Sequence, residues 1–220
     1  MFLDMVLYFW IRLRYMSISS LLRLKVSTIQ YERLGENSRT STLRVSHTAW
    51  LFNGSHPMLP RLAQRVAQIT GLHVYESFDD TMAGEGLQVL NYGIGGFYMA
   101  HMDLLFRNDP VKMKHCWPVL TNDTCERFVF LPGDRIATWM FYMSDVTAGG
   151  RTSFPNAGVS APAVRGSAVF WYNTKLNGQP NHQSLHGGCP VLMGEKWVAN
   201  KWIRENANFL RRPCTTDNDQ

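Results

Sequence analysis

The sequence predicts a mainly β fold with supporting helices, in which two sheets enclose the core. Short apolar runs separated by turns with glycine or proline carry this prediction. Only a stretch near the start has the 3.6-residue period of an amphipathic helix. The 220 residues are 45% hydrophobic and 18% charged, which is typical of a globular domain with a sizeable core.

The first predicted elements precede residue 72. Residues 21–31 alternate apolar and polar side chains, as a half-buried strand does, and residues 42–51 predict a second strand. A helix begins near Pro57 and stops at Gly71. Its apolar face is predicted to comprise Leu59, Leu62, Val66 and Ile69.

The remaining strands are predicted from apolar runs in the second half of the chain. They span residues 86–92, 97–103, 136–144 and 167–172, with a hairpin formed by residues 186–192 and 196–203. Glycines predict turns at residues 93–96 and 148–150. Residues 108–134 are polar and predict a surface insertion. This pattern is typical of a double-sheet all-β core.

Charge and cysteine content exclude some function classes. The net charge is +5, but the basic residues are scattered and do not alternate with aromatic residues, so nucleic-acid binding is not indicated. The four cysteines form no Cys-x-x-Cys pair, so a zinc cluster is not indicated, although two disulfides are possible. The tripeptides at residues 53–55 and 122–124 match the glycosylation sequon, which also arises by chance.

The amino-terminal segment does not fit a membrane span or a signal peptide. Residues 5–11 are apolar but too few to cross a bilayer, and Arg12 and Arg14 follow them rather than precede them. We expect the packed first helix of a domain that has lost its upstream neighbour, in a fragment or a short isoform. The expected division is a poorly matched segment at residues 1–20, one main domain at 21–214 and a polar tail at 215–220.

One short motif suggests metal chemistry. On an extended strand His101 and Asp103 leave the same face, because side chains at i and i+2 point the same way. Two histidines and one carboxylate on one face form the open iron(II) site of non-haem oxygenases. His186, 83 residues after Asp103, can return to the same end of a two-sheet fold. Alone, the His-x-Asp pair is a weak signal, and a histidine that hydrogen-bonds a nearby carboxylate at a strand end is the more common explanation.

A lysine on a later strand suggests an anionic ligand. Side chains on one face of that strand are Lys196, Val198, Asn200 and Trp202. If this face is inward, Lys196 needs an anionic partner, which a dicarboxylate would supply. The alternative is a lysine at the sheet rim that reaches solvent along its methylene groups. Both interpretations remain open from the pattern alone.

Several long segments resemble one known family. Residues 91–103, 135–150, 166–173 and 189–202, followed by 209–214, resemble the catalytic domain of the collagen prolyl 4-hydroxylase α subunit. The resemblance extends from about residue 21 to Cys214. It implies a double-stranded β-helix, which is a jelly-roll, cupin-like fold. It also implies 4-hydroxylation of peptidyl proline in procollagen-like chains with Fe(II), O₂, 2-oxoglutarate and L-ascorbate.

The resemblance also assigns roles to residues of this chain. It implies three iron ligands, namely His101, Asp103 and His186. Lys196 would pair with the distal carboxylate of 2-oxoglutarate, and Tyr92 and Thr152 would hydrogen-bond that carboxylate. The residues implied to line the substrate side of the iron are Tyr98 and Trp202.

Partners, location and disulfides are implied in the same way. The family partner is protein disulfide isomerase, which acts as the β subunit. The implied location is the lumen of the endoplasmic reticulum, and there we expect this chain to be a glycoprotein. Cys189 and Cys214 match a family disulfide, whereas Cys116 and Cys125 are paired by proximity alone.

Three departures from the family pattern bear on substrate choice. Phe97 stands where a polar residue is expected, Arg151 stands where a small residue is usual, and residues 184–185 replace a Thr-Arg pair. None of them removes an implied ligand. Two alternatives therefore remain beside prolyl 4-hydroxylation: a non-catalytic module that binds proline-rich peptides, and a related 2-oxoglutarate oxygenase with another substrate.

Overall fold

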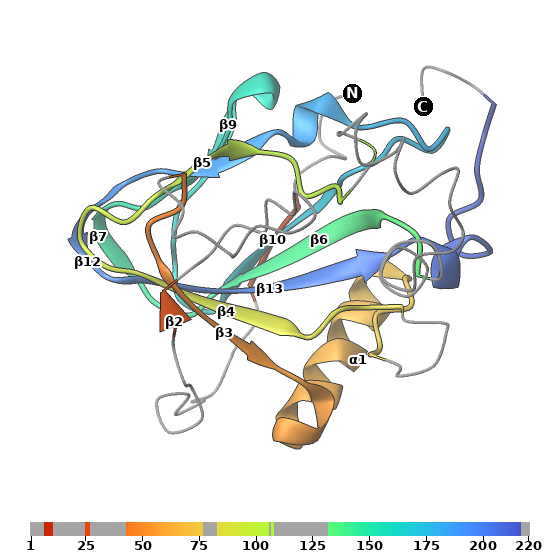
Figure 1. The fold of residues 1–220 in the computed structure, drawn as a ribbon, viewed down its shortest axis with the longest axis horizontal. Helices are drawn as coiled ribbons and strands as arrows, with labels where there is room; N and C mark the ends of the chain where they lie inside the picture. Colours follow the sequence, from red (N-terminus) through yellow and green to blue (C-terminus); the bar gives the residue numbers. More distant parts are fainter. Residues whose placement is uncertain are drawn as a thin grey trace, which may run out of the picture.

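The described part of the chain forms two facing antiparallel sheets with one helix outside the larger sheet (Figure 1). The structure, a computed structural model, describes residues 7–10, 25–26, 43–76, 83–105, 107 and 132–216. The smaller sheet is β5 (Tyr98–His101), β11 (His186–Gly188), β8 (Thr152–Phe154) and β9 (Val159–Ala161) in spatial order. A two-stranded ribbon pairs β12 (Val191–Gly194) with β7 (Val146–Gly149). The predicted jelly-roll fold is confirmed.

The larger sheet is the platform of the molecule. Its seven strands lie in the order β1 (Leu7–Trp10), β10 (Ser167–Tyr172), β6 (Arg135–Tyr142), β13 (Lys196–Arg204), β4 (Leu87–Tyr92), β3 (His47–Leu51) and β2 (Lys25–Val26). All its neighbouring strands are antiparallel. Short 3-10 turns follow several strands, at Asn53–Ser55, Pro155–Ala157, His182–Ser184 and Asn206–Asn208.

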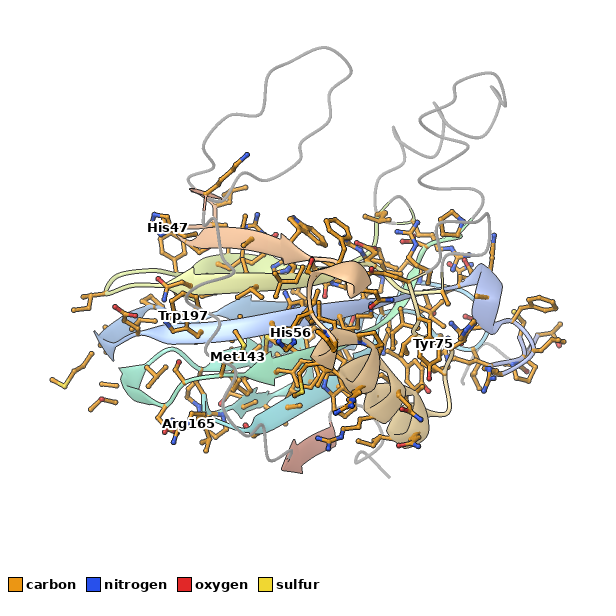
Figure 2. The ribbon with its side chains drawn as sticks, turned by 90° about the horizontal axis from the view of Figure 1, so that it is seen from below. His47, His56, Tyr75, Met143, Arg165 and Trp197 are labelled. Atoms are coloured by element: carbon orange, nitrogen blue, oxygen red, sulfur yellow. The ribbon has the colours of Figure 1, made fainter. Side chains whose placement is uncertain are left out.

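The core is divided by the larger sheet into two layers, because successive side chains of a strand point to opposite faces. The outer layer packs under the helix and includes Leu87, Val89, Trp139, Phe141 and Ile203. The inner layer lies between the sheets and includes Leu90, Tyr142, Phe154, Trp171 and Val198. In Figure 2, Met143 and Trp197 lie close together, and both pack partly buried against the outer layer. The inner face is the one that meets the smaller sheet.

The helix α1 (Met58–Thr70) follows the predicted pattern with one correction. Its buried residues are Leu59, Ala63 and Val66, and Gly71 ends it in the left-handed conformation with φ 72°. Ile69 is 43% exposed, so its assignment to the apolar face was wrong. The inward-facing positions Leu59, Ala63 and Val66 recur every three or four residues, so the next inward-facing residue is Thr70 and not Ile69. The Thr70 hydroxyl donates to the Val66 carbonyl.

Three local predictions were wrong, because strand pairing in the folded protein determines the secondary structure of short segments. Residues 7–10 form β1, which pairs with β10, and not a packed helix. β12 and β13 are not a hairpin, since β12 pairs with β7 while β13 pairs with β4 and β6. Residues 148–149 belong to β7 rather than to a turn. The short strands β8 and β9 were not predicted.

The predicted disulfide between Cys189 and Cys214 is absent, since the structure has both residues as free thiols. The two cysteines lie against different segments. The Cys189 amide donates to the Arg151 carbonyl, whereas the residue after Cys214 donates to the Leu176 carbonyl. Cys116, Cys125, the second sequon and most of the predicted insertion lie outside the described residues. No helix among the described residues is both long and apolar enough to cross a membrane.

Candidate active site

Three metal-binding side chains meet on the smaller sheet. His101, Asp103 and His186 offer ligand atoms that all lie within 4.8 Å of one another. His101 and His186 are direct cross-strand partners on β5 and β11, and Asp103 follows β5 by two residues. The nearest carboxylate oxygens lie 3.4 Å from His101 Nε2 and 3.7 Å from His186 Nε2. The structure thus brings together the three residues that the sequence singled out.

Each histidine is oriented by a backbone carbonyl. His101 Nδ1 lies 2.9 Å from the Met99 carbonyl oxygen, and His186 Nδ1 lies 2.8 Å from that of Ser184. A carbonyl accepts, so Nδ1 is assigned the proton in both rings and Nε2 keeps its lone pair. Both lone pairs are therefore on the nitrogen beside Asp103, which suits joint coordination of one cation.

Asp103 is held by a buried hydrogen-bond chain from the larger sheet. The Thr138 hydroxyl donates to Asp103 Oδ2 at 2.7 Å, and Asn173 Nδ2 donates to the Thr138 oxygen at 2.9 Å. Both supporting residues are fully buried, on β6 and directly after β10. Sequence reasoning missed them, because a threonine inside an apolar run gives no sign of its partner.

The electrostatics of the cluster favour an ionised Asp103 and a neutral His186. Burial alone raises the pKa of Asp103, but the neighbouring imidazoles of His186 and His101 and the Arg135 guanidinium hold it well below its usual range. Burial lowers the pKa of His186 to about 4. At neutral pH the cluster therefore presents the negative charge of Asp103 and the lone pair of His186 Nε2, both of which suit a divalent cation.

Aromatic rings wall the site and limit the access of water. Trp171 and Phe154 pack against His186, with ring centroids 4.6 and 5.6 Å away. Tyr98 stacks on His101 at 3.7 Å. The predicted place of Tyr98 beside the metal ligands is thus observed.

Lys196 lies deep inside the inner layer and carries an unneutralised charge. Its side chain is 2% exposed, and burial lowers the pKa of its ammonium to about 8. No carboxylate among the described residues forms an ion pair with it. Nζ donates to the Thr152 hydroxyl at 3.3 Å and lies 5.6 Å from the Tyr92 ring centroid. The rim alternative from the sequence is therefore wrong, and the buried cation calls for an anionic ligand.

The residues predicted around Lys196 are in place, with one addition. Tyr92 is its direct cross-strand partner on β4, and Thr152 is 2% exposed on β8. Burial raises the pKa of the Tyr92 phenol, so this group stays a neutral hydrogen-bond donor. Tyr142 was missed: its hydroxyl donates to the Thr152 oxygen at 2.7 Å. Its position in an apolar run predicted packing only.

Trp202 lies on β13 directly opposite Thr138, the residue that bonds to Asp103. The Arg135 guanidinium stacks on the Trp202 ring at 3.7 Å, and Glu85 bonds that guanidinium twice, at 2.6 Å each. The Arg135–Glu85 pair therefore fixes the orientation of the Trp202 indole. Arg135 and Glu85 had no distinguishing sequence signal.

Comparison with known proteins places this geometry in a family. The family model described as "2OG-Fe(II) oxygenase superfamily" matches residues 87–204, a range that holds all three metal-binding side chains and Lys196. The chain belongs to this superfamily. Membership gives it Fe(II) and 2-oxoglutarate as its cofactors.

The relatives of this oxygenase include prolyl 4-hydroxylase alpha subunits. Human prolyl 4-hydroxylase subunit alpha-1 is 40% identical over 88% of this chain and 32% of its own length. The human alpha-3 subunit is 41% identical over 83% of this chain and 30% of its own length. This oxygenase thus spans about a third of the curated relatives that it matches.

A solved structure agrees with these relatives. The viral collagen prolyl hydroxylase of Paramecium bursaria Chlorella virus-1, in complex with 2-oxoglutarate, superposes with a TM-score of 0.54 at 25% identity. The match covers 73% of this chain and 79% of the viral one.

The observed donor set fits the family cofactors. Two imidazoles and one carboxylate in a single cluster are the donors that non-haem Fe(II) oxygenases use. The buried ammonium of Lys196, backed by the Thr152 hydroxyl, fits a carboxylate. Both halves of the site thus match the groups that the family name specifies.

Proposed function

We propose that this oxygenase is a prolyl 4-hydroxylase that converts peptidyl proline in procollagen-like chains to 4-hydroxyproline, with succinate and CO₂ as the other products. The observation that carries the proposal is the pairing of a His-Asp-His cluster with a buried lysine in one inner face. The 40% identity to prolyl 4-hydroxylase alpha subunits supports proline as the residue acted on. We place the oxygenase domain at residues 21–214.

In this proposal the cluster and Lys196 hold the two cofactors. His101, Asp103 and His186 would hold Fe(II) through three protein donors, a set that suits a metal which must also bind 2-oxoglutarate and O₂. When bound, iron, 2-oxoglutarate and O₂ supply the oxidising chemistry, in which 2-oxoglutarate is decarboxylated to succinate.

The side chains around Lys196 orient the cosubstrate. The Lys196 ammonium neutralises the distal carboxylate, while Thr152 and Tyr92 offer hydrogen bonds to it. The Tyr142 hydroxyl keeps the Thr152 side chain in one rotamer. Fixing one end of a five-carbon acid orients its other end toward the metal ligands.

The substrate side is formed by aromatic side chains. Tyr98 stacks on His101, and Trp202 lies opposite Thr138, whose hydroxyl bonds to Asp103. The Arg135 guanidinium stacks on the Trp202 ring. Rigid rings place a proline ring with little loss of conformational entropy and exclude water from the reaction. The departures at Phe97 and Arg151 lie nearby: Phe97 lines a surface hollow together with Tyr98, and Arg151 bonds outward to Ser160.

Finer properties of the relatives complete the proposal. We infer L-ascorbate as the reductant that keeps the iron ferrous, the endoplasmic reticulum lumen as the location and protein disulfide isomerase as the partner. The 40% identity to alpha subunits supports these inferences. Co-purification with protein disulfide isomerase after co-expression tests the last one.

The test of the proposed function is succinate release by the purified chain. Fe(II), 2-oxoglutarate and ascorbate are supplied with and without a (Pro-Pro-Gly) repeat peptide, and His186→Ala is the control. Peptide-dependent succinate formation that the control lacks supports the proposal. Peptide binding without succinate formation by a folded, iron-loaded chain points instead to a non-catalytic binding module.

A further inference from the structure

The inner face of the larger sheet holds a second polar cluster that the cofactors do not use. Gln88 on β4 and Asn200 on β13 are direct cross-strand partners, so their side chains lie side by side on this face. Gln88 Oε1 and Asn200 Oδ1 are buried, and neither oxygen has a hydrogen-bond partner among the described residues. Gln88 is 5% exposed. Buried acceptor oxygens without partners are costly, which marks a place where a ligand can supply the missing hydrogen bonds.

A hydrogen-bond donor lies next to Asn200 on the same face of β13. Trp202 follows Asn200 by two residues and therefore points to the same face. Its indole Nε1 is also buried and without a partner in the part of the chain that the structure describes. Two acceptors and one donor in a row match the alternating N–H and C=O groups of a peptide main chain.

Exposed aromatic rings continue this series of polar groups onto β3, the strand next to the edge strand β2. Trp50 on β3 is the cross-strand partner of Gln88 and lies 5.7 Å from the Trp202 ring centroid. Trp50 is 40% exposed and the following Phe52 is 49% exposed. Gly86 permits this arrangement, because a Cβ there would lie 3.0 Å from the Phe52 ring. Exposed aromatic faces are the surfaces on which polyproline II segments dock.

The series formed by Trp202, Asn200, Gln88 and Trp50 begins close to the metal-binding cluster. Trp202 is the cross-strand partner of Thr138, whose hydroxyl holds Asp103. From β6 to β3 the sheet crosses β13 and β4, which is about 14 Å at a strand spacing of about 4.8 Å. A polyproline II chain rises about 3.1 Å per residue, so four or five residues cover this distance.

We propose that Gln88, Asn200 and Trp50 form a subsite for the main chain of the substrate, running from the metal-binding cluster to the edge of β3. The two amide oxygens accept peptide N–H groups, and Trp50 packs on a ring four or five residues from the hydroxylated proline. This inference rests on the proposed function, since it assumes a proline-containing peptide substrate. It adds a recognition site for residues remote from the reacting one.

The test compares the KM of two variants for a long and a short peptide substrate. Trp50→Ala and Gln88→Met are assayed for KM with a (Pro-Pro-Gly)₅ peptide and with a blocked Pro-Pro-Gly tripeptide, and their affinity for 2-oxoglutarate is measured by calorimetry. The control is Asn91→Ala, an amide on the same strand that faces the opposite side and bonds to Glu195. Melting curves check the fold of every variant.

We expect each variant to raise KM about 10-fold for the long peptide. For Trp50→Ala the tripeptide should show no change, because it is too short to reach β3. An unchanged KM for the long peptide overturns the proposal. For Trp50→Ala an equal loss with both peptides also overturns it, since that would place Trp50 beside the reacting proline. A loss of affinity for 2-oxoglutarate in either variant overturns it as well, since that would place the side chain at the cofactor. Absence of peptide-dependent turnover in the unmodified chain would instead contradict the proposed function itself.

Discussion

Thr138 shows how one buried hydroxyl controls a metal ligand. It donates to Asp103 Oδ2 while it accepts from Asn173 Nδ2. We predict that Thr138→Val weakens metal binding 10- to 100-fold, because the carboxylate loses the bond that orients it. Titration with Mn(II) or Co(II) as a stand-in for Fe(II) measures the effect. Thr147→Val, at an exposed position, is the control, and equal affinity in the two variants would contradict the role of Thr138.

The pKa of Lys196 determines how the affinity for 2-oxoglutarate should depend on pH. Burial lowers its pKa to about 8, and only the protonated ammonium attracts the distal carboxylate. The dissociation constant should therefore rise as pH increases above about 8, by up to 10-fold per pH unit. Calorimetric titration between pH 7 and pH 9 measures it. In Lys196→Arg the guanidinium stays charged, so a retained pH dependence in that variant would show that another group is responsible.

At the scale of elements, the ribbon formed by β7 and β12 depends on Gly149. Its φ is 77°, and a Cβ there would collide with the Pro190 carbonyl oxygen. Gly158 has a similar φ of 69° but open space around it. We predict that Gly158→Ala costs about 1–2 kcal/mol from backbone strain alone, whereas Gly149→Ala costs clearly more. Thermal unfolding compares the two, and equal losses would show that the collision is relieved.

The sequence predicted those elements whose pattern is local. The strand at residues 167–172 is observed with the predicted bounds, and α1 ends at Gly71 as predicted. β8 and β9 have three residues each, too few for a period to show. They form because they pair with each other and because β8 also pairs with β11. The same limit explains β1, whose partner β10 lies far along the chain.

The site residues that could be predicted are those whose residue type is unusual in its sequence context. An imidazole two residues from a carboxylate and a lysine on an apolar strand stand out in a sequence, and both belong to the site. Thr138, Tyr142 and Gln88 do not stand out. Their roles come from cross-strand register, which sequence alone does not give.

At the scale of the whole molecule, one carboxylate joins three central strands. Glu85, just before β4, bonds to Arg135 at the start of β6 and to Arg204 at the end of β13. Burial by itself raises the pKa of Glu85, but the two guanidinium groups lower it to about 2 from 4.5. A carboxyl group with a depressed pKa stabilises the fold above its unfolded pKa, and this stability is lost as pH falls from about 4.5 toward 2.

We predict that Glu85→Gln destabilises the protein by about 3–5 kcal/mol at pH 7, because two buried guanidinium groups lose their counter-charge. The difference from the unmodified protein should shrink between pH 4.5 and pH 2. Denaturant unfolding at pH 7 and pH 3 measures both effects. Equal differences at the two pH values would show that Glu85 is not the titrating group.

The central claim is that the inner face of this oxygenase couples 2-oxoglutarate decarboxylation to hydroxylation of peptidyl proline. The most direct measurement is the product analysis of a (Pro-Pro-Gly) repeat peptide by mass spectrometry and NMR, alongside succinate from the same reaction. The account predicts 4-hydroxyproline and succinate in equal amounts, and neither product with His186→Ala. Hydroxylation at another position or on another residue, or succinate without hydroxyproline, would contradict it.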